Sequence, residues 1–177
     1  GPILSASSHA SHLMLVGTST DGKSTSKGIY TFRWDTSTGN PEPLGLAAET
    51  PDPQFLVRSP NHRFVYSVNE ISNYQGTKTG SVSSFRVDAK AGRLETLNVV
   101  SSAAGGPCNL TIDHTGSVVF VADGAGGSLA SYRVLKDGAL SDPVSVIHYS
   151  GHSVDPRRQK TPWTHCTTVS PDNKHVL

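Results

Sequence analysis

The sequence predicts an all-β fold made of repeated four-stranded antiparallel units, and three observations lead to this prediction. The 177 residues include 17 Gly and 11 Pro, so turns are frequent. No window keeps a 3.6-residue apolar period for long enough to indicate a helix. Strand-forming and turn-forming residues also recur in the same order along the chain.

The clearest repeat is a strand that carries an aromatic residue followed by Arg, and that ends in a glycine turn. The aromatic positions, spaced 53 and 47 residues apart, are Phe32, Phe85 and Tyr132. The turn glycines, spaced 53 and 46 residues apart, are Gly39, Gly92 and Gly138. Equal spacing of two landmarks indicates a repeated structural unit rather than a single similar strand.

A second repeated element lies between these strands and consists of two apolar strands joined by a turn. Its landmarks, spaced 54 and 57 residues apart, are Pro60, His114 and Pro171. Ser-Pro-Asn and Asp-x-x-Gly favour turns, and the flanking Val, Ile, Phe and Tyr favour strands. Four strands in about 50 residues are typical of a β-propeller blade. A β-sandwich is the alternative, but the ordered recurrence of three landmarks favours the propeller.

The repeat also divides the chain. The units run over residues 13–55, 55–108 and 108–165, and the next begins at 165–177, which makes three to three and a half blades. Because a propeller closes with about 4–8 blades, we expect a partial ring that needs its remaining blades, or self-association, to cover its sheet edges. Residues 1–12 are expected to be disordered or the remnant of a cleaved tag.

Composition and charge exclude several classes of protein. The formal net charge is +1, and basic residues cluster only at 157–160, which argues against nucleic-acid binding. No apolar run approaches the ~20 residues of a membrane span. Cys108 and Cys166 do not make a disulfide framework, and no His pair is spaced on a helix to bind a metal. We expect no cofactor or metal, and a cytoplasmic location, or a periplasmic one if an export signal has been removed.

Several motifs resemble those of one family. Tyr66-Ser-Val-Asn69-Glu70 and Gly106-Pro107-Cys108 are similar to strand ends of the propeller-type lactonases, and Asp155-Pro-Arg-Arg-Gln-Lys-Thr-Pro-Trp-Thr-His165 resembles their N-P-x-R-Q-x-x-P-H-x-H. The resemblance covers residues 14–177 and implies the N-terminal half of a seven-bladed propeller. The family includes 6-phosphogluconolactonase, and related propellers include muconate cycloisomerases.

The chain departs from the family pattern at three positions. Trp163 replaces the first His of P-H-x-H, Asn109 replaces a His after Cys108, and Asp123 replaces an Asn. These changes near the expected pocket keep two alternatives open. One is a non-catalytic carbohydrate-binding or protein-binding propeller, and the other is a muconate-cycloisomerase-like enzyme.

Candidate site residues follow from the strand starts, where Gln54, Cys108 and His165 are expected around one mouth of the channel. His165 is the candidate general base, because a neutral imidazole can accept a proton from water. Glu70 is a second catalytic candidate, as an orienting group or as the base. The expected substrate-binding residues are Arg158, Gln159, Asn69 and Trp163, with Arg158 as the cation for an oxyanion or an acidic group.

The resemblance to the lactonases, together with these residues, implies a hydrolase of carbohydrate metabolism. The expected reaction is water attack on the ester carbonyl of a small anionic sugar lactone, without a metal. A cycloisomerase would need more than one cation in the pocket. A binding module would use Trp163 to stack on a sugar ring.

Overall fold

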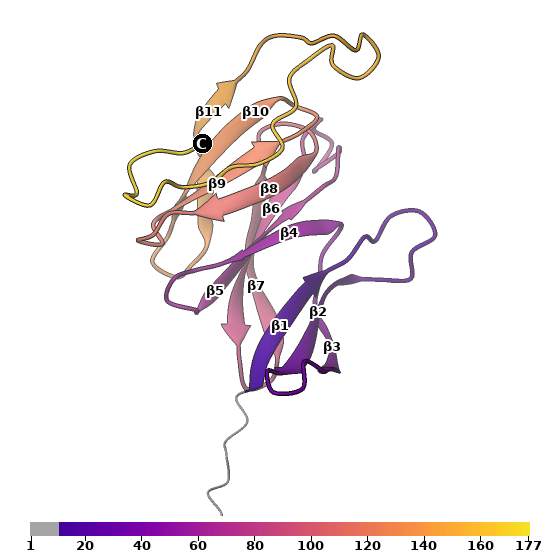
Figure 1. The fold of residues 1–177 in the computed structure, drawn as a ribbon, viewed down its shortest axis with the longest axis vertical. Helices are drawn as coiled ribbons and strands as arrows, with labels where there is room; N and C mark the ends of the chain where they lie inside the picture. The colour runs from indigo at the N-terminus through magenta and orange to yellow at the C-terminus, as the bar shows by residue number, and fades with distance from the viewer. Residues whose placement is uncertain (1–10) are drawn as a thin grey trace, which may run out of the picture.

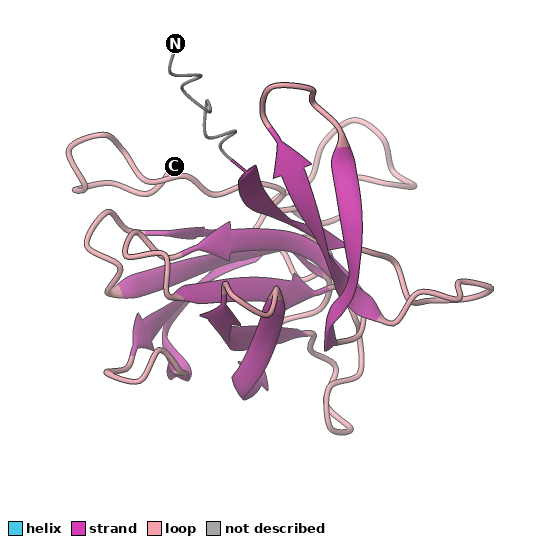
Figure 2. Cartoon of the chain, turned by 90° about the horizontal axis from the view of Figure 1, so that it is seen from below, coloured by secondary structure: helices cyan, strands magenta, loops and turns pink. Residues whose placement is uncertain are grey.

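The computed structural model describes residues 11–177, and the elements of this part of the chain are eleven β-strands. They form three antiparallel sheets of three, four and four strands, each in chain order. The sheets follow one another from the indigo strand β1 to the orange strand β11 (Figure 1) and are splayed when seen from below (Figure 2). The predicted all-β fold of partial propeller blades is confirmed. No helix in this part of the chain could cross a membrane.

We name the three sheets blades A, B and C. Blade A consists of β1 (Ser11–Gly17), β2 (Gly28–Asp35) and β3 (Pro41–Glu49). Blade B consists of β4 (Pro53–Arg58), β5 (Phe64–Asn69), β6 (Ser81–Asp88) and β7 (Arg93–Ser101). Blade C consists of β8 (Pro107–Ile112), β9 (Val118–Asp123), β10 (Ser128–Val134) and β11 (Leu140–His148).

Blade A has one strand fewer than the four expected from the repeat. In β1, Leu13 pairs with Arg33, and in β5, Phe64 pairs with the repeat-equivalent Arg86. Strand β1 therefore corresponds to β5, and within residues 11–177 no strand of blade A corresponds to β4. Most of the N-terminal segment expected at 1–12 lies outside the described residues, but Ser11 and His12 belong to β1.

The core consists of two apolar clusters, one at each junction between blades. In β9 the residues alternate, so that Val119 and Val121 are fully buried against blade B while Val118 and Phe120 are only half-buried. At the junction of blades A and B, the buried apolar residues are Ile29, Ala47, Ala48, Val65, Phe85 and Leu94. Each large side chain buried in this way stabilises the fold by about 1.5–3 kcal/mol.

Two buried tyrosines also cross the junction of blades B and C. The Tyr66 hydroxyl donates to the carbonyl of Gly138 at 3.1 Å, and the Tyr132 hydroxyl donates to the carbonyl of Ser101 at 2.9 Å. Each ring is fully buried, and its only polar atom finds a partner on the neighbouring blade. The two bonds run in opposite directions, one from blade B to C and one from C to B.

Candidate active site

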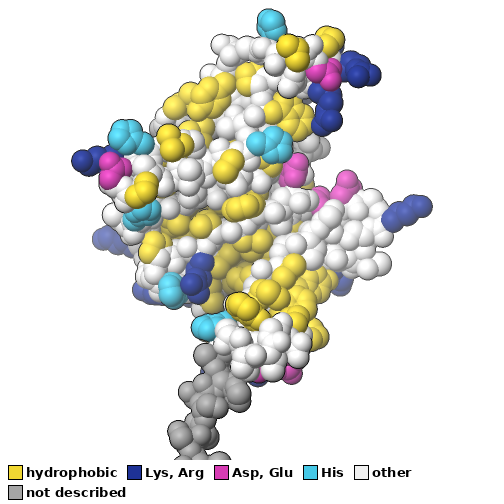
Figure 3. Space-filling model, viewed as in Figure 1, with side chains coloured by type: hydrophobic (Ala, Val, Ile, Leu, Met, Phe, Trp, Pro, Cys, Tyr) yellow, Lys and Arg dark blue, Asp and Glu magenta, His cyan; other side chains and the backbone are white. Residues whose placement is uncertain are grey.

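The loop that follows β11 surrounds a cavity of about 840 Å³. It is lined by Asp155, Arg157, Arg158, Gln159, Lys160, Thr161, Trp163 and His165. Four of the six predicted site residues are in this set, namely Arg158, Gln159, Trp163 and His165. The loop stands at the upper end of the molecule (Figure 1), where Lys and Arg side chains gather (Figure 3).

Asp155 fixes the shape of the basic part of this loop. Its Oδ1 accepts from the backbone N–H of Arg157 at 2.8 Å and of Arg158 at 3.3 Å. The Asp155 N–H donates to Gln159 Oε1 at 3.1 Å, and the Gln159 N–H donates to the Asp155 carbonyl at 2.8 Å. The Gln159 side-chain oxygen is therefore used within the loop, and its NH₂ group is the part that can serve a ligand. Sequence reasoning missed Asp155, although an Asp before a polar turn is a common signal.

Three cations, those of Arg157, Arg158 and Lys160, and one carboxylate, that of Asp155, line the cavity. Arg157 is 3.9 Å from Asp155 Oδ1 and is highly exposed, so this pair is weak. Among the described residues, neither Arg158 nor Lys160 forms an ion pair. Two cations without a protein counter-ion in one cavity can hold a carboxylate, a phosphate or a developing oxyanion.

Trp163 and His165 stack on each other in the segment after Pro162. Their ring centroids are 5.8 Å apart and the rings are inclined by 14°. Alternate residues of an extended segment project to the same side, which explains why positions 163 and 165 meet. Trp163 is 57% exposed, so its indole presents apolar surface to the cavity beside the imidazole.

Cys108, in β8 of blade C, contacts the backbone of this segment and lies within reach of the charge of Glu70. Its Sγ lies 3.5 Å from the carbonyl of Thr164 and 3.8 Å from that of His165. Burial raises the pKa of the Cys108 thiol, and the negative charge of Glu70 raises it further. Cys108 is thus held as a neutral thiol, and Glu70 lies close enough for its charge to act there. Glu70 is exposed just after β5 and is not among the residues that line the 840 Å³ cavity.

Asn69 lies inside blade B. It is the last residue of β5 and is 0% exposed. Its Nδ2 donates to Ser81 Oγ at 2.9 Å and to Ser83 Oγ at 2.7 Å, and its Oδ1 accepts from Thr50 Oγ1 at 3.1 Å. The amide therefore faces its own sheet in this geometry and fixes the strand end from which Glu70 follows.

With the geometry established, the chain can be compared with known proteins. The sequence profile of the family described as "Lactonase, 7-bladed beta-propeller" matches residues 13–177. The chain belongs to this lactonase family. The predicted resemblance, made on the motifs at 66–70 and 155–165, is confirmed.

Named lactonases are among its relatives. The 6-phosphogluconolactonase of Bacillus subtilis is 29% identical over 92% of this chain and 44% of that protein. The structure of the Pseudomonas aeruginosa periplasmic gluconolactonase has a TM-score of 0.84 and 33% identity, over 94% of this chain and 46% of that one. A Bacteroides fragilis structure has a TM-score of 0.86 and 39% identity, over 100% of this chain and 46% of that one. The chain thus spans less than half the length of these relatives.

One buried acid of the chain was noted in the sequence only as a departure from the family pattern. Asp123 ends β9 and is 0% exposed. Burial raises the pKa of its carboxyl to about 7, although hydrogen bonds from Ser102 and Ser128 act in the opposite direction. Its Oδ1 has no hydrogen-bond partner among the described residues. Comparison with Asn69 at the same repeat position could have indicated an unusual acid.

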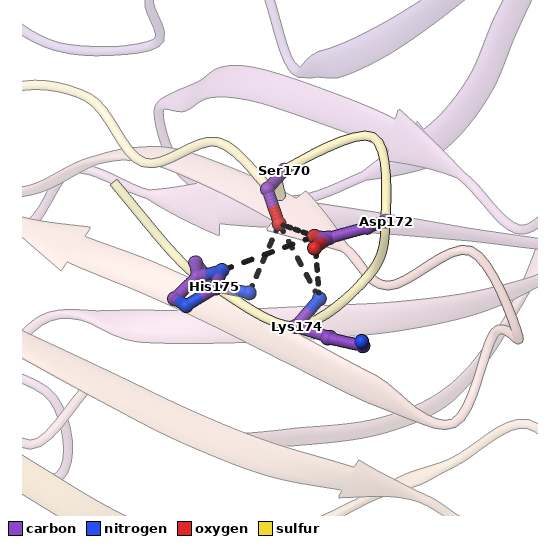
Figure 4. Close-up of polar contacts among 4 residues, drawn as sticks. All are labelled: Ser170, Asp172, Lys174 and His175. Atoms are coloured by element: carbon purple, nitrogen blue, oxygen red, sulfur yellow. Dashed lines mark hydrogen bonds and ion pairs between the residues drawn. The ribbon is translucent and has the colours of Figure 1, made fainter.

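The cluster of Ser170, Asp172 and His175 resembles a hydrolytic triad in composition, but its geometry is that of a turn (Figure 4). Ser170 Oγ donates directly to Asp172 and accepts from the His175 backbone N–H at 3.0 Å. Ser59 does the same with Asn61 and the Phe64 N–H, and there Phe64 stands in the place of His175. The repeated Ser-Pro turn explains this set, so it is not a second active site.

Proposed function

We propose that the protein to which this chain belongs hydrolyses a small anionic sugar lactone. The observation that carries the proposal is the single loop that brings His165, Arg158 and Lys160 to one cavity beside the Trp163 ring. The names of the relatives support it, since they include 6-phosphogluconolactonases and a periplasmic gluconolactonase.

In this mechanism His165 acts as the general base. Its imidazole takes a proton from water, and the hydroxide adds to the lactone carbonyl to form a tetrahedral oxyanion beside Arg158. The bond from the carbonyl carbon to the ring oxygen then breaks. The leaving alkoxide takes the proton back from the imidazolium, and the product is an open-chain hydroxy acid. Glu70 orients the water or the imidazole in this proposal.

The remaining residues bind the substrate. Lys160 pairs with the acidic substituent of the sugar, and the Gln159 NH₂ donates to a sugar hydroxyl or to the carbonyl. The exposed face of Trp163 packs against the sugar ring. Asn69 contributes indirectly in this proposal, because its bonds to Ser81 and Ser83 fix the strand end that carries Glu70.

The test uses the full-length protein with 6-phosphogluconolactone and gluconolactone, and follows acid release against the spontaneous rate. We expect His165→Ala to lower kcat by 10²-fold or more, in the range typical of a lost general base. Lys160→Ala should raise KM more for the phosphorylated lactone than for the neutral one, because Lys160 is the residue that pairs with the acidic substituent. His148→Ala, at the last residue of β11 and outside the cavity lining, is the matched control and should leave both constants unchanged. Turnover by His165→Ala equal to that of the parent protein would contradict the mechanism.

The exposed indole of Trp163 favours a second candidate function, a carbohydrate-binding propeller without catalysis. Saturable sugar binding that is lost in Trp163→Ala, together with no lactone turnover, would select it. The third candidate is a cycloisomerase, for which Arg158 and Lys160 provide two cations. Adding cis,cis-muconate to the assay panel tests it directly.

We also propose that blades outside this chain cover two open edges. One is the edge of blade A, and the other belongs to the segment after blade C in which Val169 pairs with Val176. The periplasmic gluconolactonase among the relatives supports a periplasmic location, with the cytoplasm as the alternative. Cell fractionation of the native host separates these two locations. Sedimentation of residues 1–177 alone tests the coverage, since open edges should lead to self-association.

A further inference from the structure

A second cavity, of about 460 Å³, lies between blades A and B at the end of β4 remote from Glu70. It is lined by Ser11, His12, Leu13, Leu15, Arg33, Arg58, His62, Val65, Val87, Ala89, Gly92, Arg93 and Leu94. Strand β4 begins beside Asn69 and ends at Arg58, so this cavity and the Glu70 end of blade B are separated by the length of the strand. It shares no lining residue with the candidate active site.

The chemistry of this cavity is sharply divided. Its floor is apolar and consists of Leu13, Leu15, Val65, Val87 and Leu94. Its rim carries the cationic or titratable side chains of Arg33, Arg58, Arg93, His12 and His62. None of the described residues that line it is Asp or Glu. Lys, Arg and His side chains gather beside an apolar area near the start of β1 (Figure 3).

The junction of blades B and C shows why there is space here. Leu13 of blade A corresponds to Phe64 of blade B, because each pairs with the Arg of the repeat. A Cβ built on Gly138 would collide with the ring of Phe64, so that ring fills the space beside this glycine. At Gly92, the equivalent glycine, the nearest atoms belong to Leu44 and Thr31. Leu13 is smaller than Phe64 and is not among the side chains nearest Gly92, and both Leu13 and Gly92 line the cavity.

The same comparison shows that the cations are particular to the A–B junction. Arg58 and Arg93 correspond to Ile112 and Ala139 at the B–C junction by strand register. Arg86 is 3.5 Å from Glu95, its cross-strand partner. Arg33 pairs in register with Glu42, but among the described residues it forms no such ion pair. Three guanidinium groups therefore surround an apolar floor without a neutralising carboxylate.

We propose that this cavity binds a small anion with an apolar body, of the class of medium-chain carboxylates and alkyl phosphates. The acid group pairs with the guanidinium groups of Arg58 and Arg93, which can bind a carboxylate or a phosphate through two parallel hydrogen bonds. The alkyl body lies on Leu13, Val65 and Leu94. The volume is within the range of about 300–1,000 Å³ usual for small-molecule sites.

The test is calorimetric titration of the full-length protein with octanoate and with octyl phosphate at low salt. We expect saturable binding with one site per chain. Octanol has the apolar body alone and acetate the charge alone, so each should bind at least tenfold more weakly than octanoate. Arg93→Ala and Leu13→Phe, which introduce the residues of the B–C junction, should each weaken octanoate binding at least tenfold.

Arg133→Ala is the matched control, since Arg133 occupies the repeat position of Arg33 in blade C and lies outside the cavity. It should leave the affinity unchanged. If Leu13→Phe does not fold, the surface variant Arg93→Ala decides. Absence of saturable octanoate binding overturns the proposal. This holds also if the cause is that a segment outside residues 11–177 fills the cavity. Unchanged affinity of the folded Arg93→Ala variant for octanoate also overturns the proposal.

Discussion

Blades B and C end their second strands at the same register position, but with different residues. Asn69 pairs with Ser81 in blade B, and Asp123 pairs with Ser128 in blade C. Asn69 has a partner for each polar group, from Thr50, Ser81 and Ser83. An amide is suited to this place because it can donate and accept at once.

In blade C the residue at this position and one of its neighbours differ from those in blade B. The amide is an acid, and Ala130 occupies the position of Ser83. Ser128 donates to Asp123 Oδ2 at 3.2 Å, but Oδ1 has no partner in the described part of the chain. The comparison teaches that the same position in the fold can hold either an amide with all its hydrogen bonds made or a carboxyl with one oxygen unpaired. Because burial disfavours the charged carboxylate, the unpaired carboxyl binds a proton more readily.

The largest expected effect is the pH dependence that Asp123 gives to stability. Its folded pKa of about 7 is raised above the ordinary 3.8, so the native state binds the extra proton between these values. Its stabilising contribution is complete below pH ~4 and is lost as pH rises through 7, by about 4 kcal/mol at 1.36 kcal/mol per unit. Asp123→Asn should remove this loss. Thermal unfolding of the full-length protein from pH 4 to 8 measures it.

Asn69→Asp is the matched control for that experiment. It places an acid in blade B and should add a pH dependence of the same sign. If the Asp123→Asn variant retained the full decline between pH 4 and 7, the decline would have to come from another group.

A smaller effect of opposite sign is expected from Asp113 in the turn between β8 and β9. Burial raises the pKa of this carboxyl, but bonds from Thr115, Val118, Asn173 and Ser117 outweigh burial and lower the pKa to about 2. Its contribution of about 2 kcal/mol is present above pH ~4 and is lost as pH falls through 2. Asp113→Asn should flatten acid unfolding below pH 4, which circular dichroism measures. Asp142→Asn, at an exposed position of β11, is the control, and an equal change there would contradict the assignment.

The smallest effect is expected from a substitution that gives blade C the hydroxyl that Ser83 provides in blade B. Ala130→Ser should donate a hydrogen bond to Asp123 Oδ1 and stabilise the protein by about 1 kcal/mol at pH 8, where the acid is ionised. Denaturant unfolding at pH 8 measures the gain. The reverse change, Ser83→Ala, should destabilise blade B by a similar amount. Destabilisation by Ala130→Ser would show that the site has no room for a hydroxyl.

The fold could be predicted because its information is local and repeated. Turn glycines and aromatic-Arg strands recur at nearly constant spacing, so each blade supports the interpretation of the others. The three-stranded form of blade A could not be predicted in this way. The apolar run at 13–16 fits either a first or a second strand, and only its pairing with β2 distinguishes them.

The candidate site was predictable to the extent that it is continuous in sequence. Arg158, Gln159, Trp163 and His165 come from one loop, so the motif alone places them together. Glu70 is related to this loop only through Cys108, which depends on how blades B and C pack. Asn69 ends a strand beside an exposed residue, and its three hydroxyl partners lie 12 to 19 residues away from it in sequence.

The crossed tyrosine bonds have a consequence for the geometry of the ring. Tyr66 reaches Gly138 near the turn end of the junction, and Tyr132 reaches Ser101 near the other end. Two attachments at separate points fix an angle, whereas one would allow rotation about itself. The step angle between neighbouring blades determines how many blades complete a circle. These two phenol hydroxyls therefore help to fix the angle between blades B and C, the quantity on which the number of blades in a ring depends.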